Sequence, residues 1–84
     1  MSQTEMLNVS AYRFVRLAPE QLVTIKADLL SKANDLALKG TVLLSTEGIN
    51  LFVAAATAAV EAFFTHLNRY AEFTDLPRKD SFSQ

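Results

Sequence analysis

The stretch Thr41-Val42-Leu43-Leu44-Ser45-Thr46-Glu47-Gly48-Ile49-Asn50-Leu51-Phe52-Val53 decides the fold of this chain. Residues 41–46 and 49–53 are both runs of strand-forming character, with β-branched, aliphatic and aromatic side chains. Only Glu47-Gly48 separates them, and glycine tolerates the positive φ angle that a two-residue turn demands. The stretch therefore predicts a tight antiparallel hairpin.

Three further segments flank the hairpin. Residues 7–17 alternate in side-chain character and predict a strand, with Asn8, Ser10, Tyr12, Phe14 and Arg16 on one side. Residues 20–36 and 57–70 carry apolar side chains at helical spacing, which predicts an amphipathic helix in each. The order strand, helix, strand, strand, helix is that of an α+β, ferredoxin-like (acylphosphatase-like) βαββαβ sandwich without its last strand.

The two ends of the chain carry no comparable pattern. We expect residues 1–6 to form a flexible arm, residues 7–76 the domain, and residues 77–84 a mobile tail. A missing last strand leaves a sheet edge open, and an open edge can pair with a second copy of the chain. A homodimer through this edge is therefore one expectation.

Composition limits the function. The chain has 84 residues, no cysteine and a net charge of −1, which argues against RNA binding by bulk positive charge. No apolar run approaches the roughly 20 residues of a membrane span, and no signal peptide is evident, which favours the cytosol. We find no catalytic constellation, no cofactor motif and no metal site; the single histidine, His66, is expected on a helix surface.

Three segments resemble a known family. They are Asn8-Val9-Ser10-Ala11-Tyr12-Arg13-Phe14-Val15, Lys39-Gly40-Thr41-Val42-Leu43-Leu44 with Glu47-Gly48-Ile49-Asn50, and Glu61-Ala62-Phe63-Phe64-Thr65-His66-Leu67. Together they are similar to the N-terminal, acylphosphatase-like domain of the rhodanese-related tRNA uridine hydroxylases. The resemblance covers residues 8–75.

The resemblance implies that a rhodanese domain with an active-site cysteine follows this domain. The whole enzyme would hydroxylate the wobble uridine of tRNA with oxygen. Because this chain has no cysteine, it is expected to be non-catalytic, to position tRNA or brace the rhodanese domain, and to stop before that domain. The alternatives are a protein-interaction or dimerisation module, and an accessory domain of a rhodanese sulfurtransferase.

Acylphosphatase activity itself is not expected. The loop Arg16-Leu17-Ala18-Pro19-Glu20 has no glycine that would let backbone amides cradle a phosphate, and it adds a carboxylate at the helix start.

Candidate binding residues fall into two groups. Turn or interdomain contacts are expected from Glu47, Gly48 and Asn50, and from an aromatic face of Tyr12, Phe14 and Phe52. This face is expected to dock the rhodanese domain, although RNA-recognition motifs stack bases on aromatic side chains at comparable strands. Candidate phosphate contacts to tRNA are Arg13, Lys39, Arg69, Arg78 and Lys79, and of these Arg13, Lys39 and Arg69 are assigned to RNA binding. Scattered basic residues are, however, commonly just solvated.

Overall fold

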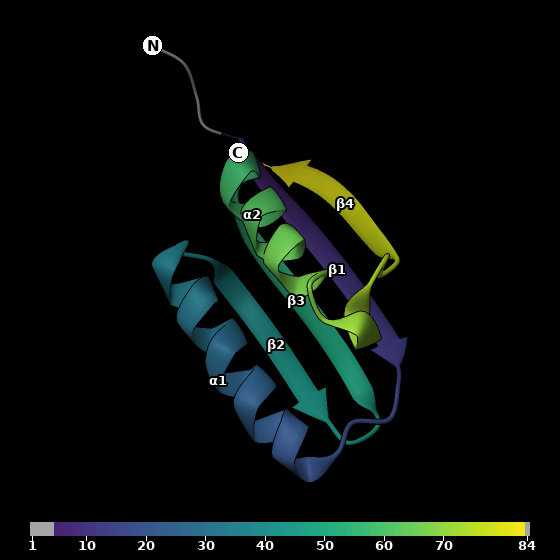
Figure 1. The fold of residues 1–84 in the computed structure, drawn as a ribbon. Helices are drawn as coiled ribbons and strands as arrows, with labels where there is room; N and C mark the ends of the chain where they lie inside the picture. The colour runs from purple at the N-terminus through teal and green to yellow at the C-terminus, as the bar shows by residue number, and fades with distance from the viewer. Residues whose placement is uncertain (1–4, 84) are drawn as a thin grey trace.

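The computed structural model describes residues 5–83 and has two layers, with both helices on one face of a four-stranded antiparallel sheet (Figure 1). The sheet order is β2-β3-β1-β4, which is the strand order of the ferredoxin-like fold. The predicted fold class is therefore confirmed. In chain order the elements are β1 (Met6–Phe14), α1 (Pro19–Asp35), β2 (Lys39–Ser45), β3 (Gly48–Ala56), α2 (Thr57–Leu67), the 3₁₀ helix η1 (Ala71–Phe73) and β4 (Arg78–Ser83).

The last strand of the βαββαβ order is present, although the sequence predicted that it is missing. Residues Arg78–Ser83 lie in the predicted mobile tail, but they form β4 and pair antiparallel with β1, from Ala11↔Arg78 to Met6↔Ser83. The strand was missed because it holds three charged residues and one large apolar residue, Phe82, so its alternation is weak. Charged side chains are a common feature of short edge strands, where they discourage pairing with other chains. Of the arm expected at residues 1–6, Met6 already belongs to β1, and residues 1–4 lie outside the described part.

The hairpin forms one residue away from its predicted position. Ser45 pairs with Gly48, so Thr46 and Glu47 make the turn and Gly48 is the first residue of β3. Gly48 has a φ angle of 144°, and a Cβ atom there would lie 2.0 Å from the carbonyl oxygen of Arg13 on β1. Glycine is thus required by the close approach of β1 to β3 as well as by its backbone angle.

Both helices differ slightly from their predicted bounds. Helix α1 begins at Pro19, and its first turn is closed by the Gln21 side chain, whose Oε1 accepts a hydrogen bond from the Ala18 amide at 2.9 Å. Helix α2 ends at Leu67 rather than near Tyr70. The three residues after Leu67 turn the chain into η1, which places Phe73 in the core.

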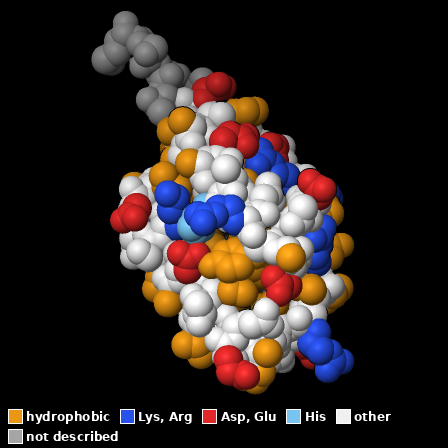
Figure 2. All heavy atoms as spheres, viewed as in Figure 1, with side chains coloured by type: hydrophobic (Ala, Val, Ile, Leu, Met, Phe, Trp, Pro, Cys, Tyr) orange, Lys and Arg blue, Asp and Glu red, His pale blue; other side chains and the backbone are white. Residues whose placement is uncertain are grey.

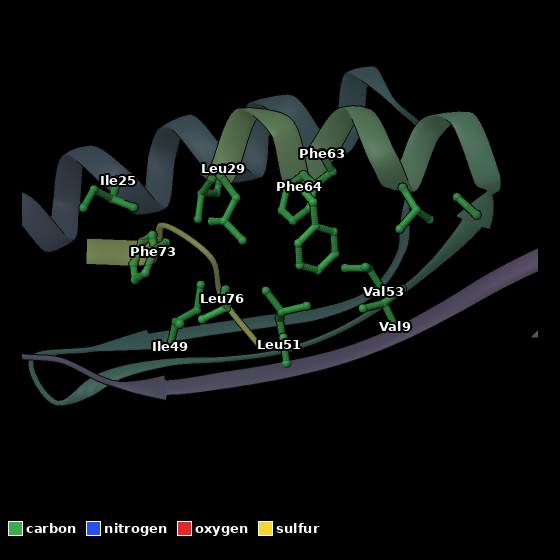
Figure 3. Close-up of a cluster of buried hydrophobic side chains, with 14 of the residues drawn as sticks. Val9, Ile25, Leu29, Ile49, Leu51, Val53, Phe63, Phe64, Phe73 and Leu76 are labelled. Atoms are coloured by element: carbon green, nitrogen blue, oxygen red, sulfur yellow. The ribbon is translucent and has the colours of Figure 1, made fainter. Parts of the chain in front are cut away.

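The core lies between the helices and one sheet face (Figure 3). The sheet contributes alternate residues of β1 and β3, because side chains of a strand point to opposite faces in turn. The helices contribute one apolar stripe each, and no polar or charged side chain is buried among residues 5–83. The labelled core side chains include Val9, Leu51 and Val53 from the sheet, Ile25 and Leu29 from α1, and Phe63 and Phe64 from α2.

Candidate functional site

The sheet face that carries no helix is the candidate site, and we call it the open face. It consists of the strand positions opposite to the core: even-numbered residues of β1 and β3 and odd-numbered residues of β2 and β4. Tyr12, Phe14 and Phe52 lie on it with 64%, 85% and 50% of their surface exposed. Leu43 on β2 adds a fourth exposed apolar side chain. The structure therefore brings together the three aromatic residues predicted from the sequence.

Cross-strand register fixes the arrangement of these side chains. Asn50 on β3 lies between Tyr12 on β1 and Leu43 on β2, each directly opposite to it. Phe52 lies one row away, opposite to Ser10 on β1. The Tyr12 and Phe14 rings make an edge-to-face contact with centroids 5.9 Å apart. Asn50 thus lies within an aromatic and aliphatic surface.

The turn residues border the open face at one end. A hollow there is lined by Phe14, Leu43, Glu47, Gly48 and Asn50, among others. A second hollow, on the β4 side, is lined by Ser10, Tyr12, Asn50, Pro77 and Lys79, among others. The aromatic face and the turn are therefore one continuous surface, with Asn50 in both hollows.

Arg13 lies on the core side of β1, not on the open face. Its guanidinium donates hydrogen bonds to three backbone carbonyl oxygens, those of Glu72 at 3.2 Å, Thr74 at 2.7 Å and Asp75 at 3.1 Å. These bonds satisfy one carbonyl group of η1 and two of the segment that links η1 to β4. These contacts identify a structural role for Arg13, and its contact with phosphate stays a prediction.

Lys39 and Arg69 are not near Arg13. Lys39 is exposed at the start of β2, where it pairs with Ala54, whereas Arg13 pairs with Ile49. Their partners Ile49 and Ala54 are five positions apart on β3, or about 17 Å at the rise of a strand. Arg69 follows α2 on the helix side of the molecule. Of the three, only Lys39 lies on the open face.

Lys79 is a basic residue of the open face whose place the sequence did not reveal. It belongs to β4 and lies directly opposite to Ser10, so it borders the aromatic side chains on the edge away from Lys39. Within residues 5–83, no Asp or Glu occupies a strand position on the open face. Glu47, in the turn, is the carboxylate that lines the adjoining hollow. Only the register of β4 places Lys79 on the open face, and the sequence did not predict that strand.

The helix side carries a polar cluster that joins α1 to α2. His66 Nε2 donates a hydrogen bond to Asp28 Oδ2 at 2.8 Å, and the Tyr70 hydroxyl donates to the same oxygen. Figure 2 shows this side of the molecule, where basic, acidic and histidine side chains meet. The hydrogen bonds from Tyr70 and then His66 lower the pKa of Asp28 below its ordinary value. Burial, followed by the bond to Asp28, raises the pKa of Tyr70 from 10.0 to about 12.

The phenol of Tyr70 is expected to titrate near pH 12 in the folded protein. A raised pKa means that this contribution to stability is complete below pH 10 and is lost as the pH rises through about 12. A Tyr12→Phe variant leaves Tyr70 as the one tyrosine, and its tyrosinate absorbance, followed with circular dichroism to monitor folding, reports the midpoint. Adding Asp28→Asn should lower the midpoint. A midpoint near 10 in the folded Tyr12→Phe variant would show that the cluster does not hold the phenol proton.

Arg78 is likewise engaged within the protein. Its guanidinium donates to both carboxylate oxygens of Glu61, at 2.7 and 3.3 Å, and to both oxygens of Asp80, at 2.9 and 3.0 Å. It also lies over the Phe64 ring, 4.6 Å from the centroid. These contacts attach β4 to α2 and raise the pKa of Arg78, first through the bond to Glu61.

Three backbone amides of the loop between β1 and α1 are already hydrogen-bonded within the protein. The amides of Val15 and Leu17 donate to the carbonyl oxygens of Glu47 and Thr46, both at 3.0 Å, and the Ala18 amide is bound by Gln21. These loop amides are therefore occupied and do not form an anion cradle.

In the described part of the chain, no group of three or more His, Asp or Glu side chains is arranged to hold a metal ion. None of the described helices is both long and apolar enough to cross a membrane.

Comparison with known proteins agrees with this architecture. A family model described as the UPF0176 acylphosphatase-like domain matches residues 6–84. Proteins named tRNA uridine(34) hydroxylase are 38% identical in Cupriavidus pinatubonensis over 94% of this chain, and 42% identical in Bordetella petrii over 94%. The protein of that name from Bordetella parapertussis is 44% identical over 95% of the chain. The chain spans 27–33% of the length of these three relatives. From the family match over nearly all its residues, the chain belongs to the UPF0176 acylphosphatase-like domain family.

Proposed function

We propose that this chain is the non-catalytic N-terminal domain of an enzyme that hydroxylates uridine 34 of tRNA. The observation that carries the proposal is that relatives with this name match 94–95% of the chain. Because the chain spans 27–33% of those relatives, the remaining length leaves room for a separate catalytic domain, such as the rhodanese domain that the sequence resemblance implies.

The role that we propose for the domain is positional. It has no cysteine, and the polar clusters around Asp28 and Arg78 join its own elements to one another. The open face, by contrast, presents three exposed aromatic side chains that its own helices do not cover. A surface of this kind favours binding, either of tRNA or of the domain that carries the chemistry.

The expectation of a homodimer depended on a sheet without its last strand, and the structure contains that strand. The edge of β1 that was expected to be open is occupied by β4.

Deletion tests the proposed function. In a longer protein that carries this chain as its N-terminal domain, removal of the domain should strongly lower the fraction of tRNA hydroxylated at uridine 34. Mass spectrometry of nucleosides from the purified tRNA measures this fraction. Soluble expression of the truncated protein, with the circular dichroism of a folded domain, is the control. Unchanged hydroxylation by the truncated protein would refute a positional role.

A further inference from the structure

The aromatic side chains of the open face lie on the two central strands of the sheet. Tyr12 and Phe14 belong to β1 and Phe52 to β3, and these two strands pair along their whole length. Exposed fractions of 64%, 85% and 50% leave much of each ring accessible to a ligand. Three accessible aromatic side chains on adjacent strands form a platform on which flat, apolar groups can stack.

The charged side chains at strand positions of the open face are all basic in the described residues. Lys39 on β2 and Lys79 on β4 lie on opposite edges of the sheet, three strand spacings or about 14 Å apart across the strands. No carboxylate occupies a strand position between them in the described residues, and Glu47 stands outside, in the turn. This arrangement is complementary to a ligand whose backbone is negatively charged and whose other groups are flat and aromatic.

Polar groups lie among the rings. Asn50 is exposed between Tyr12 and Leu43, and its amide can both donate and accept hydrogen bonds. Asn8, on the same face, is already engaged, because its Nδ2 donates to Ser83 Oγ at 3.0 Å and to the Ser81 carbonyl oxygen at 3.3 Å. Asn50 is therefore the amide that remains accessible to the edge of a base.

We infer that the open face binds single-stranded RNA. Two or three unpaired bases stack on Tyr12, Phe14 and Phe52, Asn50 contacts a base edge, and Lys39 and Lys79 contact backbone phosphates. Double-stranded RNA does not fit this surface, because its bases are stacked on one another and unavailable to the rings. This inference rests on the proposed function in one respect, namely that tRNA is the RNA that supplies the unpaired bases.

Binding by the 84-residue chain itself tests the inference, at low salt and by fluorescence anisotropy. The probes are a labelled single-stranded oligouridylate and an RNA duplex of the same length. The single strand should bind more tightly than the duplex. Each of Tyr12→Ala and Phe52→Ala should weaken binding of the single strand roughly 5- to 150-fold, the range for loss of one stacked base.

Matched variants separate stacking from charge and from general apolar surface. Leu30→Ala removes an apolar side chain with 61% exposure from α1, on the helix side, and should leave affinity unchanged. Lys79→Gln should reduce the steepness of the salt dependence by about 0.7, the value for one phosphate contact with a single strand, whereas Lys26→Gln on α1 should not.

Two results would overturn the inference. One is affinity for the duplex equal to that for the single strand, and the other is wild-type affinity in a folded Tyr12→Ala/Phe52→Ala double variant. Either would show that unpaired bases do not stack on the open face. Because the assay needs no hydroxylation, its failure is distinct from failure of the proposed function.

Discussion

A Gly48→Ala variant is expected to lose most of the stability of the domain. The new Cβ atom would lie 2.0 Å from the carbonyl oxygen of Arg13 and 3.1 Å from the Cα atom of Phe14, both in the backbone of β1. Backbone strain at a φ angle of 144° costs about 1–3 kcal/mol, and overpacking typically adds about 1–3 kcal/mol. A domain of this size has only on the order of 5 kcal/mol to lose. Urea denaturation followed by circular dichroism measures the change.

The control for this variant lies in the same turn. Thr46 is exposed, so Thr46→Ala should change the free energy of unfolding by less than about 0.5 kcal/mol. A Gly48→Ala variant as stable as Thr46→Ala would mean that β1 and β3 do not approach each other as closely as described.

An Arg13→Ala variant is expected to destabilise the protein by about 2–3 kcal/mol, the usual range for losing charge-assisted hydrogen bonds from partly buried groups. The substitution leaves the carbonyl oxygens of Glu72, Thr74 and Asp75 without their donor. It should also loosen η1, whose Phe73 is fully buried in the core. The midpoint of urea denaturation measures the loss.

The matched control is Arg16→Ala, which removes the same side chain from an exposed position in the following loop. Its expected effect is within about 0.5 kcal/mol. Equal stabilities of the two arginine variants would contradict the structural role of Arg13. If the prediction holds, any loss of RNA binding in an Arg13 variant must be corrected for loss of folding.

Local patterns were sufficient for most of the fold. The alternation of β1 and the apolar stripe of α1 each depend on residues close in sequence. The same holds for the hairpin turn that precedes Gly48. Strand β4 was missed because an edge strand buries little and its pattern is correspondingly weak. Its pairing with β1 joins residues 67 to 77 positions apart, from Ala11↔Arg78 to Met6↔Ser83.

The candidate site, too, was predicted only where local patterns are sufficient. Tyr12, Phe14 and Phe52 were placed on one face because strand alternation alone determines it. Lys79 could not be placed there without β4 and its register. The roles of Arg13 and of the Asp28–His66–Tyr70 cluster depend on partners 38 to 62 positions away, which a local pattern does not reveal.

The most direct test of a positional domain is the rate of uridine 34 hydroxylation at limiting and at saturating tRNA. The comparison is between a longer protein that carries this chain and the same protein with Tyr12→Ala and Phe52→Ala. If the open face binds substrate and takes no part in the chemistry, the variant should be slow at limiting tRNA and should recover the wild-type rate at saturation. A loss that persists unchanged at saturating tRNA would contradict this account, and so would equal rates at every tRNA concentration.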